Sequence, residues 1–510
     1  MSGSMKTPGA YIVENNDFPN SVVEVATAVP AFIGYTEKAV KDNRSLLSMP
    51  TRISSLQDFT AYFGGAPDYQ FELTETAVEK DVATAGVAGT VSAGKKKYAI
   101  MPKSTDYCLF RSLLFFFANG GNTCYIVSVG TYKDEINAES LKNGIGPLLK
   151  EEEPTMVLIP EAIQLPSKEA CYSLQQQILE HCGGKMKNRI AILDVYEGYK
   201  DFRAAEGDCV KNFREGIGNT YLDFAAAYYP WLNTELISGN ELSFKQISNR
   251  DVLAACIKEE MGVADAAKID EKGKKILELL DELSSKSFTA DEEALIHKTL
   301  VPASPVYNNI LEKIRDYLNR MAPSAAIAGI YAMVDSSRGV WKAPANVSIA
   351  SVVSSTIDIS QDEQEYLNVP SDGKAVNAIR SFTGEGVLVW GARTLDGNSH
   401  DWRYINVRRT AIMLEESISL ASKAYVFESN TASTWDSIKR MISNFLEGIW
   451  KRGGLAGATE EDAFSVHVGL GETMAAKDIL ENILRITVMV ALVRPKEFIE
   501  ITLQQHMEKS

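Results

Sequence analysis

The stretch LRITVMVALVRPKEFIEITLQQHMEKS, residues 484–510, decides how the C-terminal part of the chain folds. In each of the two runs 486–493 and 499–504, every second residue would face the same side of a strand, and most of these residues are β-branched or apolar. Arg494-Pro495-Lys496 separates the two runs. A period of two predicts two strands around a turn. A strand at the end of a chain exposes unpaired N–H and C=O groups that recruit other chains. Either this strand is covered by its own domain, or it pairs with a second molecule.

Length and composition narrow the possible classes of protein. The 510 residues have room for about two to four domains. The net charge of −15 argues against general binding of nucleic acid, which needs a basic surface. The most apolar stretch, residues 109–118, is too short for the roughly 20 residues of a bilayer span, and residues 1–16 lack the apolar core of a secretory signal. Six scattered cysteines without a CxxC pair indicate reduced, cytosolic thiols.

The first half of the chain predicts an arm followed by an α/β domain. Prolines punctuate residues 1–30, which we expect to be extended. Apolar runs predict core strands, and the segment 167–182 predicts a helix with Ser167 as N-cap and Gly183-Gly184 as its stop. Strand–helix–strand order at this spacing predicts a largely parallel sheet. The expected strands lie within residues 31–39, 123–130, 155–162 and 188–198.

The second half predicts helices and then a separate α+β unit. Residues 236–320 are rich in Ala, Leu, Lys and Glu, which predicts helices, and β character returns over 344–355 and 386–395. Within 396–510 we expect helices at 407–429 and 433–454, a strand in 463–471, a short helix around 475–483 and the terminal strand pair. The second long helix has one apolar stripe, and we expect the helix to end at Gly453. The stripe consists of Trp435, Ile438, Ile442, Phe445 and Ile449.

Catalytic motifs are hard to find in this sequence. The segment 89–96, GTVSAGKK, matches a phosphate loop until Lys96, which stands where Ser or Thr should hold magnesium, and it follows no buried strand, so we interpret it as a flexible loop. The five histidines form no HExxH and no GxSxG occurs; spacing alone leaves open a triad assembled in space. We therefore assign no catalytic residue, cofactor or metal, and composition favours a structural or interaction protein.

Several long blocks resemble contractile tail sheath proteins. They are residues 6–39, 116–130, 225–232, 328–347, 377–410 and the C-terminal unit to Leu503. The resemblance implies an extended arm (1–30), a subtilisin-like α/β core without a catalytic triad (31–395) and a C-terminal α+β domain that faces an inner tube (396–510). Residues 66–100 and 236–300 match least, and we interpret them as insertions.

The resemblance also implies a function and partners. Sheath subunits polymerise as a six-fold helical sheath around an inner tube, and contraction drives the tube through a target envelope. The implied partners are further copies of the chain, the inner tube protein, and baseplate and terminator or cap proteins, without nucleic acid or membrane insertion. The implied location is the bacterial cytoplasm during assembly, then a phage-tail-like particle or a cell-bound injection apparatus. The alternatives are a sheath-like paralogue that caps or initiates a tail, a subtilisin-type hydrolase and a P-loop ATPase.

The family's strand exchange and tube contacts imply two sets of site residues. In the family, the N-terminal arm and the C-terminal strand pair with the sheets of neighbouring subunits, which answers the question raised by the terminal strand. The exchanged residues would be Tyr11, Val13, Val23, Val25, Ile499, Ile501 and Leu503. In the family a helix and adjoining loops meet the tube, and here the segment 471–482 would do so through Glu472, Lys477, Asp478 and Glu481.

Overall fold

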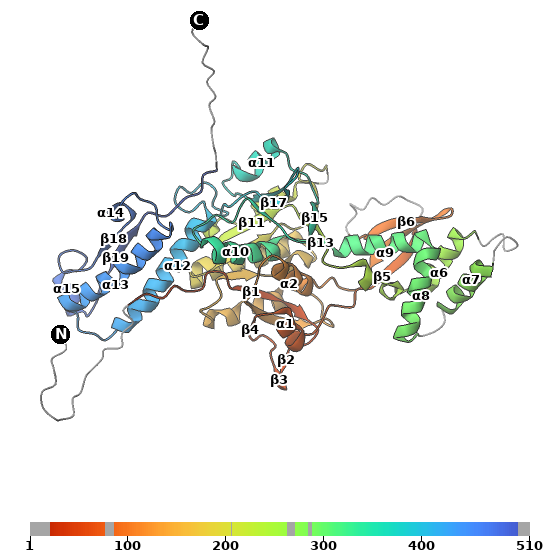
Figure 1. Cartoon of the computed structure of the whole chain (residues 1–510), viewed down its shortest axis with the longest axis horizontal. Coiled ribbons are helices and arrows are strands. Elements are labelled where there is room, and N and C mark those ends of the chain that lie inside the picture. Colours follow the sequence, from red (N-terminus) through yellow and green to blue (C-terminus); the bar gives the residue numbers. More distant parts are fainter. Residues whose placement is uncertain (1–20, 77–85, 206, 263–270, 284–287, 498–510) are drawn as a thin grey trace, which may run out of the picture. The chain divides into compact units, whose positions relative to one another are not determined.

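The computed structural model describes residues 21–76, 86–205, 207–262, 271–283 and 288–497. These residues form two compact units, each described here by itself (Figure 1). Residues 21–25 and 410–493 belong to the smaller unit, and the remaining described residues belong to the larger one. The chain passes between the units after Val25, after Arg409 and after Val493.

A nine-stranded sheet forms the centre of the larger unit. Its six strands from β16 to β8 run parallel, and antiparallel strands lie at both edges. All residues of β1, β9, β10 and β11 are buried, as expected of parallel strands covered on both faces. In sheet order the strands are β14 (Val347–Ser348), β17 (Gly386–Val389), β16 (Asn377–Phe382), β11 (Ala225–Tyr229), β10 (Ile190–Asp194), β9 (Met156–Leu158), β1 (Pro30–Thr36), β8 (Cys124–Thr131) and β4 (Thr51–Ile53).

This sheet confirms the α/β class and the four core strands predicted in the first half of the chain. Its order β8-β1-β9-β10-β11 corresponds to the 2-1-3-4-5 order of doubly wound folds, in which the direction of winding reverses beside the first strand. The finer expectation of a subtilisin-like core stays a prediction.

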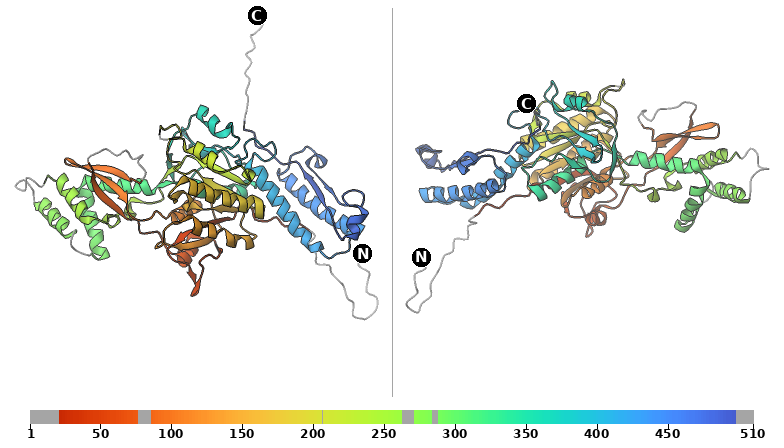
Figure 2. Two further views of the ribbon diagram at one scale, coloured as in Figure 1. Left: turned by 180° about the vertical axis from the view of Figure 1, so that it is seen from behind. Right: turned by 45° about the horizontal axis from the view of Figure 1, so that its top comes forward.

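Helices cover both faces of the sheet (Figures 1 and 2). Helices α2 (Leu109–Ala118) and α10 (Ser324–Arg338) pack against each other on one face, while α3 (Ala138–Asn143), α4 (Lys168–Leu179) and α5 (Cys209–Gly216) follow one another on the other. The close approach of α2 and α10 depends on Gly329, because a Cβ there would lie 2.5 Å from the carbonyl oxygen of Phe116.

Helix α4 confirms its predicted start but corrects its predicted end. The Ser167 side chain accepts a hydrogen bond from the Ala170 N–H, as an N-cap does. The helix does not stop at Gly183-Gly184, because a π-helical turn, Glu180–Met186, continues it until Lys187 with φ of 62°. Gly183 provides close packing instead, since a Cβ there would lie 2.5 Å from Cβ of Tyr221.

The two segments interpreted as insertions share one hydrophobic core within the larger unit. The segment at 89–96 is not the flexible loop we expected, because β6 and β7 form a hairpin that turns at Gly94 and Lys95. The Lys96 ammonium there lies 3.0 Å from the Glu75 carboxylate. The elements of this core are β5 (Phe71–Thr76), β6 (Gly89–Ala93), β7 (Lys96–Pro102), α6 (Arg250–Glu260), α7 (Glu271–Leu283), α8 (Ala290–Ala303) and α9 (Pro305–Leu318).

Smaller elements complete the larger unit. A three-stranded sheet and a two-stranded hairpin accompany the central sheet. The three-stranded sheet consists of β13 (Arg320–Met321), β12 (Leu232–Thr234) and β15 (Val352–Ser355), and the hairpin of β2 (Val40–Lys41) and β3 (Arg44–Ser45). Two further helices are α1 (Leu56–Phe63) and α11 (Gln361–Asn368).

The smaller unit is built on the apolar stripe of its long helix. In α13 (Ala432–Lys451), Ile438, Ile442, Phe445 and Ile449 are buried as predicted, and Gly453 follows the helix with φ of 82°. Helix α12 (Ile405–Ser422) ends earlier than predicted, since Phe427 has a positive φ of 75°, which a helix does not accommodate. The other elements are α14 (Glu460–Ala463), β18 (Phe464–His467), α15 (Ala476–Leu480) and β19 (Thr487–Val490).

Candidate functional site

Three of the described histidines are placed for structural roles. His181 is buried, and burial lowers its pKa to about 4, so its ring stays neutral. His297 Nδ1 lies 2.8 Å from the Tyr307 hydroxyl oxygen, and burial lowers the pKa of His297 as well. His400 Nδ1 lies 3.1 Å from the Arg403 guanidinium. No group of three His, Cys, Asp or Glu side chains in the described ranges is arranged to hold a metal ion.

The fourth described histidine joins a hydrogen-bonded chain in the order of a hydrolase triad. His467 Nε2 lies 3.1 Å from Ser465 Oγ, and Nδ1 lies 2.5 Å from a Glu472 carboxylate oxygen. This bond lowers the pKa of Glu472. However, Ser465 lies within a regular antiparallel strand, without the sharp turn that presents a nucleophile, and the His467 side chain is 35% exposed. Triad catalysis depends on a site that excludes water, so we assign these bonds to fixing the turn that carries Glu472.

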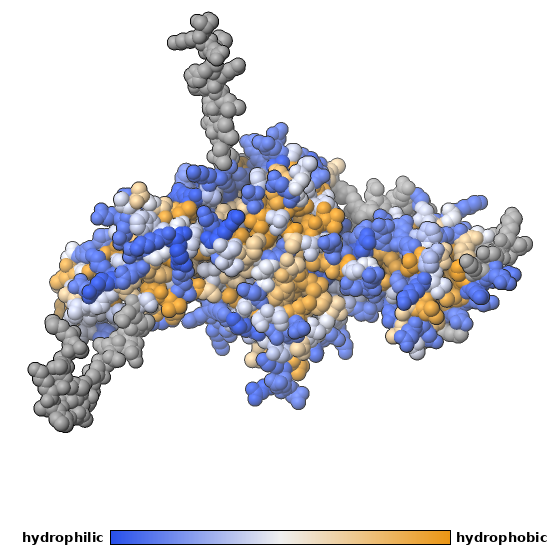
Figure 3. All heavy atoms as spheres, in the orientation of Figure 1, coloured by the Kyte–Doolittle hydropathy of each residue, from blue (hydrophilic) through white to orange (hydrophobic). Residues whose placement is uncertain are grey.

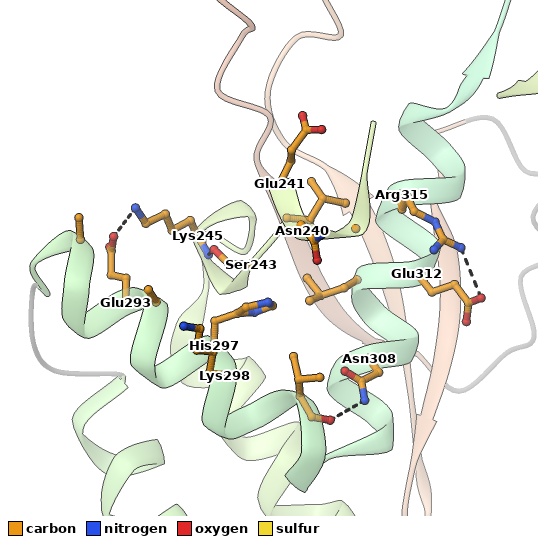
Figure 4. A pocket seen from close by; sticks show the side chains of 16 residues that line it. Asn240, Glu241, Ser243, Lys245, Glu293, His297, Lys298, Asn308, Glu312 and Arg315 are labelled. Atoms are coloured by element: carbon orange, nitrogen blue, oxygen red, sulfur yellow. Dashed lines mark hydrogen bonds and ion pairs between the residues drawn. The ribbon is translucent and has the colours of Figure 1, made fainter. Parts of the chain in front are cut away.

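A groove of about 810 Å³ lies beside α8 and α9 in the helical part of the larger unit (Figure 4). Several polar groups along it pair with each other. Lys245 forms an ion pair with Glu293, and the Asn308 amide donates to the Val301 carbonyl oxygen over 2.7 Å. His297 points into this groove, but Tyr307 holds its Nδ1. The groove therefore assembles no nucleophile with a base among the described residues.

The smaller unit contains a two-stranded antiparallel sheet, β18 and β19. Phe464 pairs with Val490 and Val466 with Val488. Phe464 and Val466 are buried and β18 packs on α13, whereas Met489 of β19 is 55% exposed. In the described part of the chain no third strand joins this sheet, so both of its outer edges are open. Two-stranded sheets are marginal on their own, and open edges accept further strands.

The predicted terminal strand pair is thus resolved in part. Its first strand is β19, which pairs with β18. The second strand, with Ile499, Ile501 and Leu503, lies outside the described residues, as do Tyr11 and Val13.

The described end of the N-terminal arm forms no strand. Residues 22–26 have no regular secondary structure, and the Val23 side chain is 71% exposed. Val25 is half-buried, and its N–H donates to Ser417 Oγ over 3.1 Å. A β-prone run that finds no strand partner within its own chain, over the residues described here, retains the capacity to pair with another chain.

The segment predicted to meet a tube, 471–482, is a turn followed by a short helix. Helix α15 covers only Ala476–Leu480, and Glu472 lies in the preceding turn. Lys477 is 81% exposed and lies 3.6 Å from Glu481. Asp478 instead caps the helix: its carboxylate accepts from the Ala475 N–H at 2.8 Å and meets Arg485 at 3.1 Å, and these bonds lower its pKa. Glu472, Lys477 and Glu481 keep 42%, 81% and 51% of their side chains exposed, although Glu472 also binds His467. Asp478 is 18% exposed and has a structural role.

Hydrophobic side chains also reach the surface of the smaller unit. Figure 3 shows such side chains among hydrophilic ones over this unit. Leu480 of α15 is 83% exposed, beside the charged Lys477. None of the helices in the described ranges combines the length and apolarity that crossing a membrane requires.

Sequence comparison finds two tail sheath domains in the second half of the chain. Residues 263–395 match the phage tail sheath protein central domain, and residues 398–506 match the phage tail sheath C-terminal domain. The tail sheath protein of Enterobacteria phage T4 is 31% identical over 142 residues, which are 27% of this chain and 21% of that protein. The chain thus spans about a fifth of the length of the curated relatives it matches.

Solved structures extend the similarity to the whole chain. The sheath complex of PVC, an extracellular contractile injection system, in its contracted state is 26% identical, covers 99% of both chains and has a TM-score of 0.59. A chain of the six-fold symmetrised baseplate of the anti-feeding prophage is 25% identical, covers 99% of this chain and 100% of that one, and has a TM-score of 0.57. The fold is that of contractile sheath proteins, and residues 263–395 and 398–506 are similar to the two tail sheath domains.

Proposed function

We propose that this chain is the sheath subunit of a contractile injection system. In this role it polymerises as a six-fold helical sheath around an inner tube and contracts to drive that tube through a target envelope. The observation that carries the proposal is the similarity to the PVC sheath in its contracted state over 99% of both chains. The open sheet of the smaller unit supports it independently, since it offers edges for strands of other subunits.

Strand exchange is the proposed means of polymerisation. The N-terminal arm, through Tyr11, Val13, Val23 and Val25, and the C-terminal strand, through Ile499, Ile501 and Leu503, would join the β18–β19 sheet of neighbouring copies. Each backbone hydrogen bond gained is worth about 1 kcal/mol net, and each buried apolar side chain about 1–3 kcal/mol. Because such head-to-tail pairing does not close on itself, it propagates as a helical lattice.

The accessible charges around α15 are the proposed contact with the inner tube. Of the four residues predicted from the sequence, Glu472, Lys477 and Glu481 are available for ion pairs with a tube protein, whereas Asp478 would hold the segment in shape. Exposed ion pairs are individually weak. A stable contact with the tube would therefore require many copies of this segment, repeated along the sheath.

The other proposed partners are baseplate and terminator or cap proteins, and assembly would take place in the bacterial cytoplasm before incorporation into a tail-like particle or cell-bound apparatus. The similarity to a chain of the anti-feeding prophage baseplate supports one alternative, a sheath-like paralogue that initiates or caps the tail. Electron microscopy of the purified chain separates the two, because long hollow tubes are expected of a main-body sheath and short rings of a paralogue.

Truncation tests the proposed exchange at each end. Chains lacking residues 1–25 or 498–510, the second of which keeps Glu497, are expected to remain folded and monomeric, by circular dichroism and light scattering, but to form no tubes. The intact chain, assembled in parallel, is the control. If one truncated chain still forms tubes of normal length, the exchange idea is wrong for that end.

A further inference from the structure

The three points at which the chain leaves the larger unit lie beside two buried arginines. Thr27 follows the first crossing, Arg409 is the last residue before the second, and Glu497 lies shortly after the third. The Arg409 and Arg393 side chains are only 3% and 4% exposed. A buried guanidinium is costly unless it is fully paired, so these two positions call for an explanation.

Arg409 joins the arm to the core through three hydrogen bonds. It forms two hydrogen bonds with the Asp335 carboxylate of α10, at 2.5 and 3.0 Å, and a third with the Thr27 carbonyl oxygen at 2.9 Å. The Thr27 hydroxyl donates to the same carboxylate over 2.6 Å. The next bond along is between the Val29 N–H and Thr155 Oγ1, at 3.0 Å. Thr27, at the root of the arm, is thus held through both its backbone carbonyl and its side-chain hydroxyl.

Arg393 holds the chain at its third crossing in the same way. It forms two hydrogen bonds with the Glu497 carboxylate, at 2.5 and 3.0 Å, and a third with the Asn368 carbonyl oxygen at 3.0 Å. The Tyr404 hydroxyl donates to Glu497 over 3.1 Å. By contrast, the neighbouring Arg494 and Asp401 are 3.5 Å apart, with 54% and 78% of their side chains exposed.

We propose that the Arg409–Asp335 and Arg393–Glu497 pairs are mechanical anchors, which transmit the pull of exchanged strands from both ends of the chain to the rigid core of the larger unit. The inference rests on the proposed function, because only a polymer joined through its ends places such a load on them. Bidentate arginine–carboxylate pairs suit the task, since their two parallel bonds fix direction as well as distance. Asp335 lies on α10, which packs against the central sheet, so the load at the first anchor reaches the core directly.

The test compares full-length variants in tube assembly and under shear. Glu497→Gln removes the carboxylate charge of one anchor, and Thr27→Val removes the hydroxyl that donates to the Asp335 carboxylate of the other, both with little change of shape. Arg494→Gln is the matched control at an exposed pair. We expect the Arg494→Gln monomer to unfold at the wild-type midpoint. Both anchor-variant monomers should stay folded under the shear conditions, with a lower midpoint for Glu497→Gln because it leaves the buried Arg393 charge unpaired. After a fixed shear, tubes of the two anchor variants should be several-fold shorter by electron microscopy, while Arg494→Gln tubes keep the wild-type length.

A second readout separates anchoring from a merely structural role. Thr27→Val should raise hydrogen exchange at the Val29 amide in the monomer by about tenfold, the change that loss of about 1.4 kcal/mol gives, with Arg494→Gln unchanged there. If wild-type chains form no tubes at all, the proposed function itself fails. If wild-type and anchor-variant tubes survive shear equally, the anchors are disproved and the sheath role stands. Arg409→Gln is the stronger perturbation, but the two milder variants decide the question even if it does not fold.

Discussion

Glu161→Gln should abolish a pH-dependent loss of stability that the wild-type chain shows above pH 4.5. Glu161 follows β9 at the carboxyl end of the sheet and is completely buried. One carboxyl oxygen accepts from the Leu109 N–H over 2.9 Å, at the start of α2. The other faces Gly34 so closely that a Cβ on Gly34 would lie 2.2 Å from it. Gln has nearly the same shape, so the substitution removes the titration without leaving a cavity.

The size of the effect follows from the pKa. Burial raises the pKa of Glu161 from 4.5 to about 8. A carboxyl group whose pKa is raised on folding stabilises the fold fully below its unfolded pKa, and that contribution is lost as the pH rises through its folded pKa. At about 1.36 kcal/mol per pKa unit, the loss between pH 4.5 and about 8 is on the order of 5 kcal/mol. It should level off above that range.

Urea unfolding of the wild type and of Glu161→Gln across this pH range is the assay. The free energy of unfolding of the variant minus that of the wild type should increase steadily as the pH rises from 4.5 to about 8. Subtraction cancels Asp194, whose pKa burial raises to about 6, because both chains contain it. Glu139→Gln, at a side chain that is 72% exposed, is the control. A difference that stays constant with pH would refute the reasoning.

Three further changes test the packing and the absence of a phosphate loop. Gly329→Val should lower the free energy of unfolding by about 1–3 kcal/mol in urea titrations, because the new side chain meets the Phe116 carbonyl oxygen. Gly448→Ala, which has open space at its Cβ, should not lower it, and equal effects of the two changes would contradict the close-packing argument. Ile442→Ala should speed hydrogen exchange in the smaller unit, since a buried Ile→Ala change costs about 2–5 kcal/mol; unchanged exchange would place this stripe outside the core. Lys95→Ala should leave nucleotide binding at background by calorimetry, since Lys95 lies in a hairpin turn; binding that disappears with Lys95 would revive the ATPase alternative.

Local patterns in the sequence were enough to find elements whose cause is local. The apolar stripe of α13 and its stop at Gly453 follow from the helical period and from a glycine's access to positive φ. The buried strands β1, β8, β9 and β10 follow from short apolar runs, and the start of α4 follows from the Ser167 hydroxyl. In each of these cases a window of a few residues contains the physical reason.

Elements set by distant contacts were missed. Gly183 resembles a helix stop, but the packing of Tyr221 against it determines its role. The hairpin of β6 and β7 is stabilised by a core shared with helices more than a hundred residues away, which no local window contains. The anchors left little local signal: Arg409 stands between Arg408 and Thr410, and nothing in the sequence names Asp335 or Glu497 as the partner of a buried arginine.

Under the proposed function, the energetics of a single exchanged strand explain why two are needed. β18 and β19 pair over four residues, so an added strand of that length gains about four backbone hydrogen bonds of about 1 kcal/mol each. Association of free chains costs about 4–15 kcal/mol in lost translation and rotation. One strand of this length therefore cannot hold two diffusing chains together through its backbone alone. A second strand from the same rigid unit binds almost intramolecularly and avoids most of that cost. That advantage exists only while both chain ends are fixed to one body, which is the task that the buried Arg393 and Arg409 perform at the roots of the two arms.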